Sequence, residues 1–207
     1  MLHFYDKEIG SDPLKKKGLK AALTGKAAYN VGGVTVHSAL RLPLNSSNML
    51  PLNSNTLDAL TKYFEQLRVL LIDEVSLIGS RMLYNIDKRL REIMHTPTRP
   101  FGNLDVIFCG DLCQAQPVRD SWIFEQPRFQ QQPFPYNFWP DMIKCYELKK
   151  VVRQKNQTFI SILNRIRTCS QTIDDIDYLN QHCYRKTPID ATFPYLFHCN
   201  KDVQEHN

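Results

Sequence analysis

The stretch "RVLLIDEVSLIG", residues 68 to 79, decides the fold of this 207-residue chain. Its first half is an almost uninterrupted apolar run, which is typical of a strand in a parallel sheet that helices cover on both faces. Two adjacent acids, Asp73 and Glu74, end the run. Burying carboxylates beside an apolar strand is costly unless they bind a cation or take part in a reaction. The ordinary alternative is a strand-end pair that caps the next turn.

Other short apolar runs alternate with stretches of helical period, the pattern of an α/β domain with a mainly parallel sheet. The predicted strands lie at 19–23, 69–73, 104–109, 146–148 and 195–198. The predicted helices lie at about 80–95, 157–168 and 173–184. The first two helices repeat apolar side chains at steps of three and four, and the third starts with a capping box at Thr172. The proline-rich and aromatic stretch 126–140 is predicted to be a loop packed by its own rings.

The composition is that of a globular protein, with 43% hydrophobic and 23% charged residues. The net charge of +5 permits nucleic-acid binding without demanding it. No apolar run approaches the roughly 18 residues of a membrane span. The first residues also lack the apolar segment of a secretory signal, so we expect an intracellular protein that does not bind membranes.

Six cysteines are spread over half the chain without close pairs, which favours reduced thiols over disulfides. Zinc-ligand types do occur at Cys109, Cys113, His182-Cys183 and His198-Cys199. Their spacing is irregular and Cys109 ends an apolar strand, which argues against a zinc site. A zinc-stabilised binding module stays open as an alternative that metal analysis would reveal.

A Gly-Lys pair at Gly25-Lys26, in "KAALTGKAAYNVGG" (20–33), raises the question of a phosphate-binding loop. Such a loop needs four residues between its first glycine and its Gly-Lys, followed by a Ser or Thr that holds Mg²⁺. Here six residues separate Gly18 from Gly25, and Ala27 has no hydroxyl. We therefore predict that Lys26 does not grip the phosphates of a nucleotide.

A second polar strand end follows in "LDVIFCGDLCQAQPV", residues 104–118, where Gln114 comes just past the next strand. Ligands of open α/β sheets bind at this end of the strands, so Gln114 and the acids at 73–74 are expected to face one crevice. Further on, Arg153 follows an apolar step and precedes a helix, and its charge suits a transferring phosphoryl group. Taken alone, Gln114 is an ordinary loop residue and Arg153 a surface charge.

The ordered set "ALTGKAAYNVGGVTVHSAL", "LLIDEVSLIGSRMLYNIDKRLREIM", "CGDLCQAQPV" and "LKKVVRQ" resembles a known family. It is similar to the PIF-type (petite integration frequency) ATP-dependent DNA helicases of superfamily one, close to the helicase segments of rolling-circle Helitron transposons. The resemblance extends from about residue 11 over nearly the whole chain. It implies a RecA-like nucleotide hydrolase domain of the phosphate-loop class at 1–140 and the start of a second RecA-like domain at 141–207. The family's phosphate loop is expected upstream of residue 1, and its later motifs beyond residue 207.

The resemblance also implies roles for single residues, with ATP and Mg²⁺ as cofactors. Asp73 would bind Mg²⁺ and Glu74 would activate water. Gln114 would sense the γ-phosphate, and Arg153 would act as an arginine finger across the interdomain cleft. The residues that would contact single-stranded DNA are Thr24, Gly25, Lys26, Thr35 and His37, so Lys26 would meet DNA. A strand-to-helix turn with a satisfied histidine is the alternative for this last set.

By resemblance, the parent protein couples ATP hydrolysis to unwinding and 5′-to-3′ translocation on single-stranded DNA. The implied settings are DNA repair, recombination, telomere maintenance or transposition, in the nucleus or the mitochondrion. Two departures stand out: Leu23 replaces a usual proline, and "AQPV" at 115–118 replaces the family's "LPPV". With the expected lack of a phosphate loop, they favour the alternative of a non-catalytic DNA-binding remnant. We expect this chain alone to hydrolyse no ATP, because its acids cannot replace the missing cradle for the phosphates.

Overall fold

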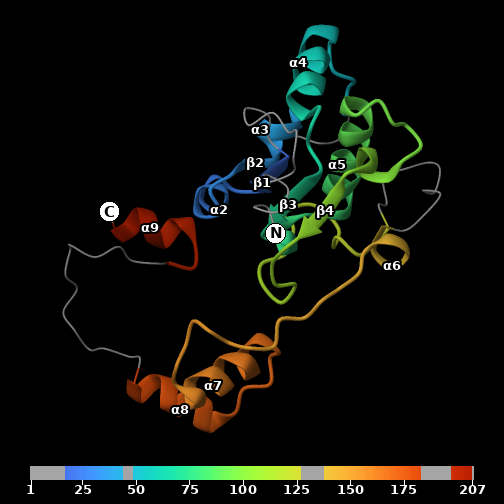
Figure 1. The fold of residues 1–207 in the computed structure, drawn as a ribbon. Helices are drawn as coiled ribbons and strands as arrows, with labels where there is room; N and C mark the ends of the chain where they lie inside the picture. The colour runs from blue at the N-terminus through green and yellow to red at the C-terminus, as the bar shows by residue number, and fades with distance from the viewer. Residues whose placement is uncertain (1–16, 44–48, 127–137, 183–196, 207) are drawn as a thin grey trace. The chain divides into compact units, whose positions relative to one another are not determined.

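The computed structural model describes residues 17–43, 49–126, 138–182 and 197–206 (Figure 1). Its internal contacts divide the chain into two units, Met1–Leu148 and Lys149–Asn207. The division falls eight residues beyond the domain boundary that the sequence suggests near residue 140.

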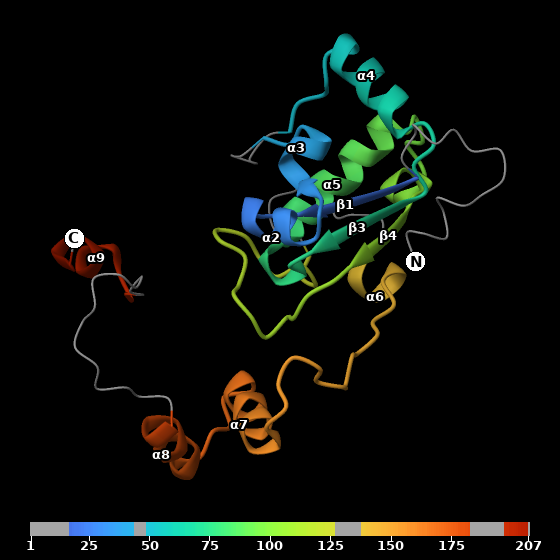
Figure 2. The ribbon, with the colours of Figure 1, turned by 60° about the vertical axis from the view of Figure 1, so that its left-hand side comes forward.

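The first unit is built on a parallel four-stranded sheet in the order β2-β1-β3-β4 (Figures 1 and 2). Its strands are β1 (Gly18–Ala22), β2 (Val34–Thr35), β3 (Val69–Asp73) and β4 (Asp105–Phe108). All three strand pairs are parallel, with Ala22 opposite Asp73 and Ile72 opposite Phe108. The predicted parallel α/β sheet is therefore confirmed, and the carboxyl ends of β1, β3 and β4 meet at one edge.

Helices and short 3-10 turns connect these strands. They are α2 (Gly25–Asn30), α3 (Val36–Leu40), α4 (Ser54–Phe64) and α5 (Ser80–Ile93), with the turns η1 (Val75–Leu77) and η2 (Pro100–Asn103). Helix α6 (Phe138–Met142) follows the last strand. The long helix α5 follows the predicted apolar period, and its ends lie within two residues of the prediction. Thr24, Thr35 and Asn53 each begin a helix by accepting a hydrogen bond from the backbone N–H three residues on.

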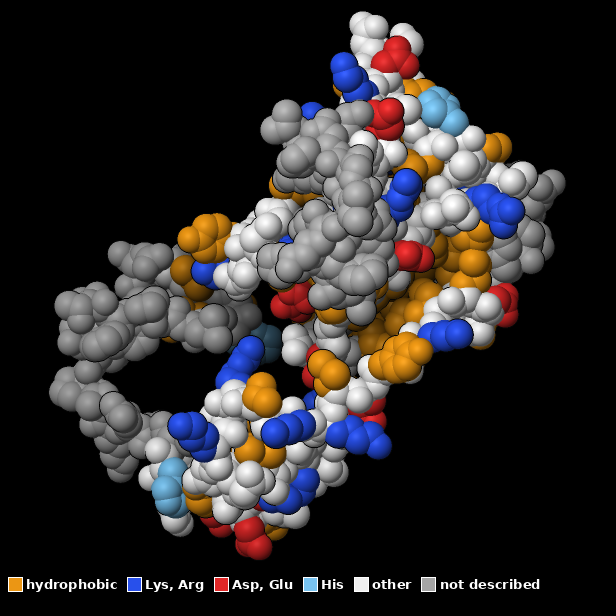
Figure 3. Space-filling model, viewed as in Figure 1, with side chains coloured by type: hydrophobic (Ala, Val, Ile, Leu, Met, Phe, Trp, Pro, Cys, Tyr) orange, Lys and Arg blue, Asp and Glu red, His pale blue; other side chains and the backbone are white. Residues whose placement is uncertain are grey.

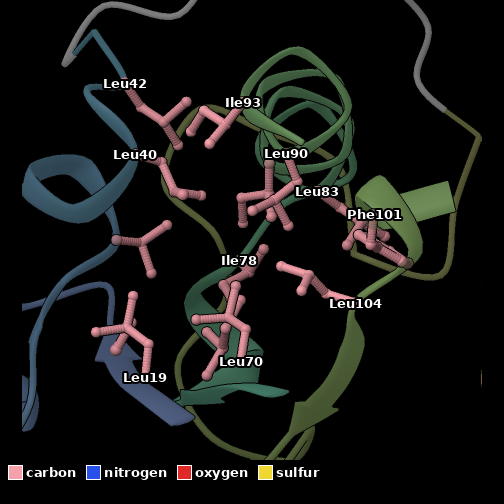
Figure 4. Close-up of a cluster of buried hydrophobic side chains, with 14 of the residues drawn as sticks. Leu19, Leu40, Leu42, Leu70, Ile78, Leu83, Leu90, Ile93, Phe101 and Leu104 are labelled. Atoms are coloured by element: carbon pink, nitrogen blue, oxygen red, sulfur yellow. The ribbon is translucent and has the colours of Figure 1, made fainter. Parts of the chain in front are cut away.

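The core lies between one face of the sheet and helices α3 and α5 (Figure 4). Leu70 and Ile72 of β3 are almost fully buried there, against Leu40 of α3 and Leu90 of α5. Full burial of each such side chain stabilises the fold by about 1.5–3 kcal/mol. Leu71 points to the opposite face and is only half-buried. The apolar run of β3 thus anchors the strand whose end carries the two acids.

The second unit contains α7 (Gln157–Arg167), α8 (Ile173–His182) and α9 (Asn200–His206). The guanidinium of Arg165 donates two hydrogen bonds to the carboxylate of Asp175, at 2.6 and 2.5 Å. Thr172 and Asp175 exchange the two hydrogen bonds of a capping box, as the sequence predicts. These contacts with Arg165 and Thr172 hold the pKa of Asp175 well below its usual range.

One predicted strand is not found, and another lies partly outside the described residues. Residues 146–148 form no strand, and Tyr146 and Leu148 are 86% and 96% exposed. The reason is that a strand needs a hydrogen-bonded neighbour, and no described segment pairs with this one. Of the predicted strand 195–198, residues 195–196 lie outside the described residues, and 197–198 are not in a strand. Most of the loop predicted at 126–140 also lies outside the described residues.

In the described part of the chain, no helix combines the length and apolar character that a membrane crossing requires.

Candidate nucleotide and nucleic-acid site

A cleft of about 220 Å³ lies at the carboxyl edge of the sheet. Three connections form it: the turn from β1 into α2, the turn from β3 into η1, and the loop after β4. The residues that line it are Thr24, Lys26, Ala27, Asn30, Glu74, Ser76, Leu77, Gln114 and Ala115. The structure therefore brings Glu74 and Gln114 to one crevice, together with two of the residues predicted to bind DNA.

The two acids sit on a strained turn. Asp73 is the last residue of β3, and Glu74 adopts the left-handed conformation, with φ 58° and ψ 50°. Such a conformation costs a residue with a side chain on the order of 1–3 kcal/mol and persists only where the surroundings enforce it. Two backbone hydrogen bonds hold this turn in place: Glu74 O accepts from Leu77 N at 3.1 Å, and Cys109 O accepts from Val75 N at 2.9 Å. The fold thus fixes where the Glu74 carboxylate is presented.

Gly110 lets the loop after β4 approach this turn closely. Its φ is +146°, and a Cβ there would lie 2.7 Å from the backbone nitrogen of Val75. Only glycine combines that φ with that approach. Next to it, burial raises the pKa of the Cys109 thiol, and the nearby charge of Asp73 raises it further. The raised pKa favours the neutral thiol at this strand end.

The loop after β4 is shaped by Asp111 before it reaches Gln114. The Asp111 carboxylate accepts a hydrogen bond from Cys113 N at 3.0 Å, and its carbonyl accepts one from Gln114 N at 3.0 Å. These two bonds close a tight turn and leave the Gln114 side chain exposed at the cleft. An amide in this place can donate to and accept from a ligand.

Sequence reasoning missed Ser76. This residue of η1 is 1% exposed and lines the cleft, yet its hydroxyl has no hydrogen-bond partner among the described residues. A buried polar group without a partner costs free energy, so such groups are rare and call for an explanation. A polar ligand in the cleft would supply the missing partner. The only sequence signal was its place two residues after Glu74.

Asp120 was also missed, and it ties the loop after β4 to helix α5. Its carboxylate accepts hydrogen bonds from the backbone nitrogens of Arg81 and Met82, at 3.3 and 3.2 Å. These N–H groups belong to the first turn of α5, which has no cap of its own. Ser80 N also donates to Ser121 O at 3.0 Å, and a Cβ at Gly79 would collide with the Asp120 carboxylate. The missing cap on α5 was the signal in the sequence.

The predicted DNA-binding residues fall into two groups. Thr24 and Lys26 line the cleft, and Gly25, the first residue of α2, is exposed between them. Thr35 instead begins α3, where its hydroxyl oxygen accepts from Ser38 N at 3.2 Å. His37 is half-buried on α3, and burial lowers its pKa, which favours the neutral ring. Neither Thr35 nor His37 lines the cleft that the described residues form.

Arg153 belongs to the second unit. It is exposed in the segment that precedes α7, three residues before the Asn156 cap. In Figure 3 several Lys and Arg side chains gather over this unit, so Arg153 is one of several basic groups there.

The described residues contain no group of three or more His, Cys, Asp and Glu side chains that could hold a metal ion. The five cysteines among them are free thiols, and Cys183 lies outside that set. Of the two acids expected to face this crevice, Glu74 lines it, whereas Asp73, the last residue of β3, is not among the lining residues. Their carboxylates are of the type that a hard cation such as Mg²⁺ prefers.

The sheet is parallel, with acids at the end of one strand and an amide on the loop after the next. Together with the likeness to solved Pif1 structures reported below, this arrangement shows an α/β domain of the RecA-like class. The family model described as "PIF1-like helicase" matches residues 8–186. The chain belongs to this family.

Individual relatives agree. The chain is similar to the "ATP-dependent DNA helicase PIF1" of Danio rerio, 31% identical over 193 residues that are 89% of this chain and 28% of the relative. It is 29% identical to the protein of that name from Saccharomyces cerevisiae, over 90% of this chain and 22% of the relative. The chain thus spans less than a third of the length of these relatives.

Solved structures of Pif1 helicases also match this chain. The chain is similar to Bacteroides Pif1 bound to ssDNA, with a TM-score of 0.73 and 26% identity. It is also similar to Pif1 from Bacteroides in complex with ADP-AlF3 and ssDNA, with a TM-score of 0.72 and 30% identity. Each match covers 99% of this chain and 48% of the other chain.

Proposed function

We propose that this chain is the part of an ATP-dependent DNA helicase in which the catalytic acid Glu74 and a loop for single-stranded DNA meet in one cleft. The whole protein would couple ATP hydrolysis to unwinding and to 5′-to-3′ movement on single-stranded DNA, in the nucleus or the mitochondrion. The observation that carries the proposal is that Glu74 and Gln114 line the same cleft as Thr24 and Lys26. The similar structures, crystallised with ssDNA and with ADP-AlF3, support both the DNA-binding and the nucleotide-binding part of the proposal.

The residues of the cleft fit the phosphate and metal end of Mg²⁺-ATP. The unpartnered hydroxyl of Ser76 offers a hydrogen bond, and the carboxylate of Glu74, with that of Asp73 next to it in the chain, suits a divalent cation. The volume of about 220 Å³ is below that of a pocket for a whole small ligand, commonly some 300–1,000 Å³. The sequence also holds no G-x-x-x-x-G-K-[ST] loop. The rest of the nucleotide therefore needs groups from outside this cleft.

Each residue has a distinct task in this proposal. ATP supplies the phosphoanhydride bond that is hydrolysed. Glu74, held in its left-handed turn, accepts the proton of the attacking water as general base. Asp73 holds the metal and Gln114 reads the γ-phosphate through its amide. Arg153, from what we propose is the start of a second RecA-like domain, stabilises the charge of the transferring group.

The backbone of the site suggests how the two functions communicate. Gly110 packs on Val75, next to Glu74, and the same loop continues to Gln114 and to the Asp120 contacts with α5. A shift of Gln114 would therefore strain the turn that carries Glu74. Lys26 lines the same cleft, so a DNA strand bound to it would be near Gln114 and could cause such a shift.

Binding of a short fluorescent single-stranded oligonucleotide by the 207-residue chain tests the DNA half of the proposal. Phosphate contacts dominate such binding, so we expect weak, salt-dependent affinity that falls when Lys26→Ala and His37→Ala are combined. A Lys62→Ala variant, on the last turn of α4, is the matched control for loss of one positive charge. Unchanged affinity of the double variant at low salt contradicts the assignment.

The second candidate is a DNA-binding remnant without catalysis, which the altered "AQPV" at 115–118 favours, because this tetrapeptide adjoins Gln114. Both candidates predict no hydrolysis by this chain alone. They differ once the chain is joined to a phosphate loop and to the later motifs of the family. The helicase then turns over ATP in a manner that depends on Glu74, and the remnant does not.

A further inference from the structure

The short helix α2 carries an exposed aromatic ring beside a lysine. Tyr29 is 79% exposed, and the Lys26 ammonium lies 5.8 Å from the centroid of its ring. This separation is within the range of a cation–π interaction. Lys26 also lines the cleft, so the pair sits at the rim of the proposed DNA site.

Helix α2, which carries this pair, is anchored to the sheet. Ala27 and Ala28, which lie between Lys26 and Tyr29, are buried and form a small apolar cluster with Ala22 at the end of β1. The backbone N–H of Ala27 is bound to the Thr24 hydroxyl at 3.2 Å. Because the two alanines fix one side of α2 to the sheet, the lysine and the ring are held on the opposite, solvent side.

Tyr29 differs from the other exposed tyrosines of the first unit. Tyr63 is half-exposed and packs edge-on against Phe64, with the ring centroids 5.5 Å apart. Tyr146 is 86% exposed but lies in a segment without secondary structure, far along the chain from the cleft residues. Tyr29 alone among these three combines exposure, a helical base and a neighbouring cleft cation.

We propose that Tyr29 is a base-stacking residue for single-stranded DNA and that Lys26 pairs with the phosphate beside the stacked base. Aromatic side chains bind single strands in this way without reading sequence, because every base has a π face. The inference rests on the proposed function, since it places one nucleotide of the same strand at the rim of the cleft.

The test separates stacking from charge. The full 207-residue chain and its Tyr29→Ala, Tyr29→Trp and Tyr146→Ala variants are titrated with a fluorescent oligothymidylate and with a matched oligonucleotide that carries abasic sites. Tyr29→Ala should bind oligothymidylate about 5- to 10-fold more weakly, as expected for one stacked base. It should bind the abasic strand as the wild type does. Tyr29→Trp should keep the wild-type affinity, and the Tyr146→Ala control should match the wild type on both strands.

Salt dependence gives a second reading. Lys26→Ala should lower the slope of log affinity against log salt by about 0.7, the value for one phosphate contact on a single strand, whereas Tyr29→Ala should leave the slope unchanged. Equal weakening of Tyr29→Ala on both strands, or no weakening on either, overturns the stacking role while the DNA site stands. Failure of the wild-type chain to bind oligothymidylate at low salt overturns the proposed function and this inference with it.

Discussion

Replacing Gly110 by alanine should destabilise the fold around the turn that carries Glu74, because the backbone at this position has no room for a side chain. The added Cβ would lie 2.7 Å from Val75 N and 3.0 Å from a methyl group of Val75, and φ at this position is +146°. The conformation costs a residue with a side chain on the order of 1–3 kcal/mol. Overpacking against Val75 adds roughly 1–3 kcal/mol. We therefore expect Gly110→Ala to lower the free energy of unfolding of the first unit by about 2–6 kcal/mol.

Urea unfolding followed by circular dichroism measures this loss. Gly25→Ala is the matched control, because a Cβ at Gly25 meets nothing within 4 Å and alanine is the better helix former. That control should be as stable as the wild type or slightly more stable. If Gly110→Ala unfolds at the same urea concentration as the wild type, the close approach of the loop to Val75 does not exist in solution, and the positioning of Glu74 needs another explanation.

Three further predictions concern single contacts. Ser76→Ala should leave the stability unchanged or raise it slightly, because it removes a buried hydroxyl without a partner. In a chain extended by a phosphate loop, the same change should raise the KM for ATP. Ser80→Ala should leave that KM unchanged, because the Ser80 hydroxyl is also buried and without a partner but does not line the cleft. Asp120→Ala should lower the free energy of unfolding in urea by about 1–2 kcal/mol, like the loss of a helix cap, and a value near zero would contradict the tie between the loop and α5. The Arg165 contact depresses the pKa of Asp175 in the folded state. The contact therefore stabilises the folded state fully above the pKa of an unfolded aspartate, near 4, and this stabilisation is lost as the pH falls through the lower pKa of the folded state. The helical signal of the wild-type second unit should therefore weaken on acidification, while Asp175→Asn should show a weaker signal already at neutral pH and less dependence on pH.

The sheet could be predicted because its strands carry their own signal. The run Val69–Asp73 is apolar and ends in charge, and helix α5 repeats apolar residues at helical steps, so both were located to within two residues. The segment 146–148 looks like a strand in the sequence but has no partner to bond with among the described residues. Strand formation depends on neighbours, and no local pattern reveals whether they are there.

The candidate site could be predicted in part for a similar reason. Glu74 and Gln114 follow strand ends, and parallel strands bring such ends together, so their meeting in one cleft follows from the pattern. The roles of Gly110, Ser76 and Asp120 depend on how loops approach each other in space. A glycine that touches a backbone and a carboxylate that caps a distant helix have no signature in their own sequence neighbourhood, and a hydroxyl left without a partner has only its position near Glu74.

The central claim is that Lys26 binds DNA and Glu74 catalyses ATP hydrolysis, and that both side chains line one cleft. Steady-state ATP hydrolysis with and without single-stranded DNA tests it most directly, in a chain extended by a phosphate loop and the later motifs. Lys26→Ala should keep the basal rate and lose most of the stimulation by DNA, whereas Glu74→Gln should abolish both rates while DNA still binds. Loss of basal hydrolysis in Lys26→Ala with normal DNA affinity would make Lys26 a nucleotide-binding residue and contradict the account.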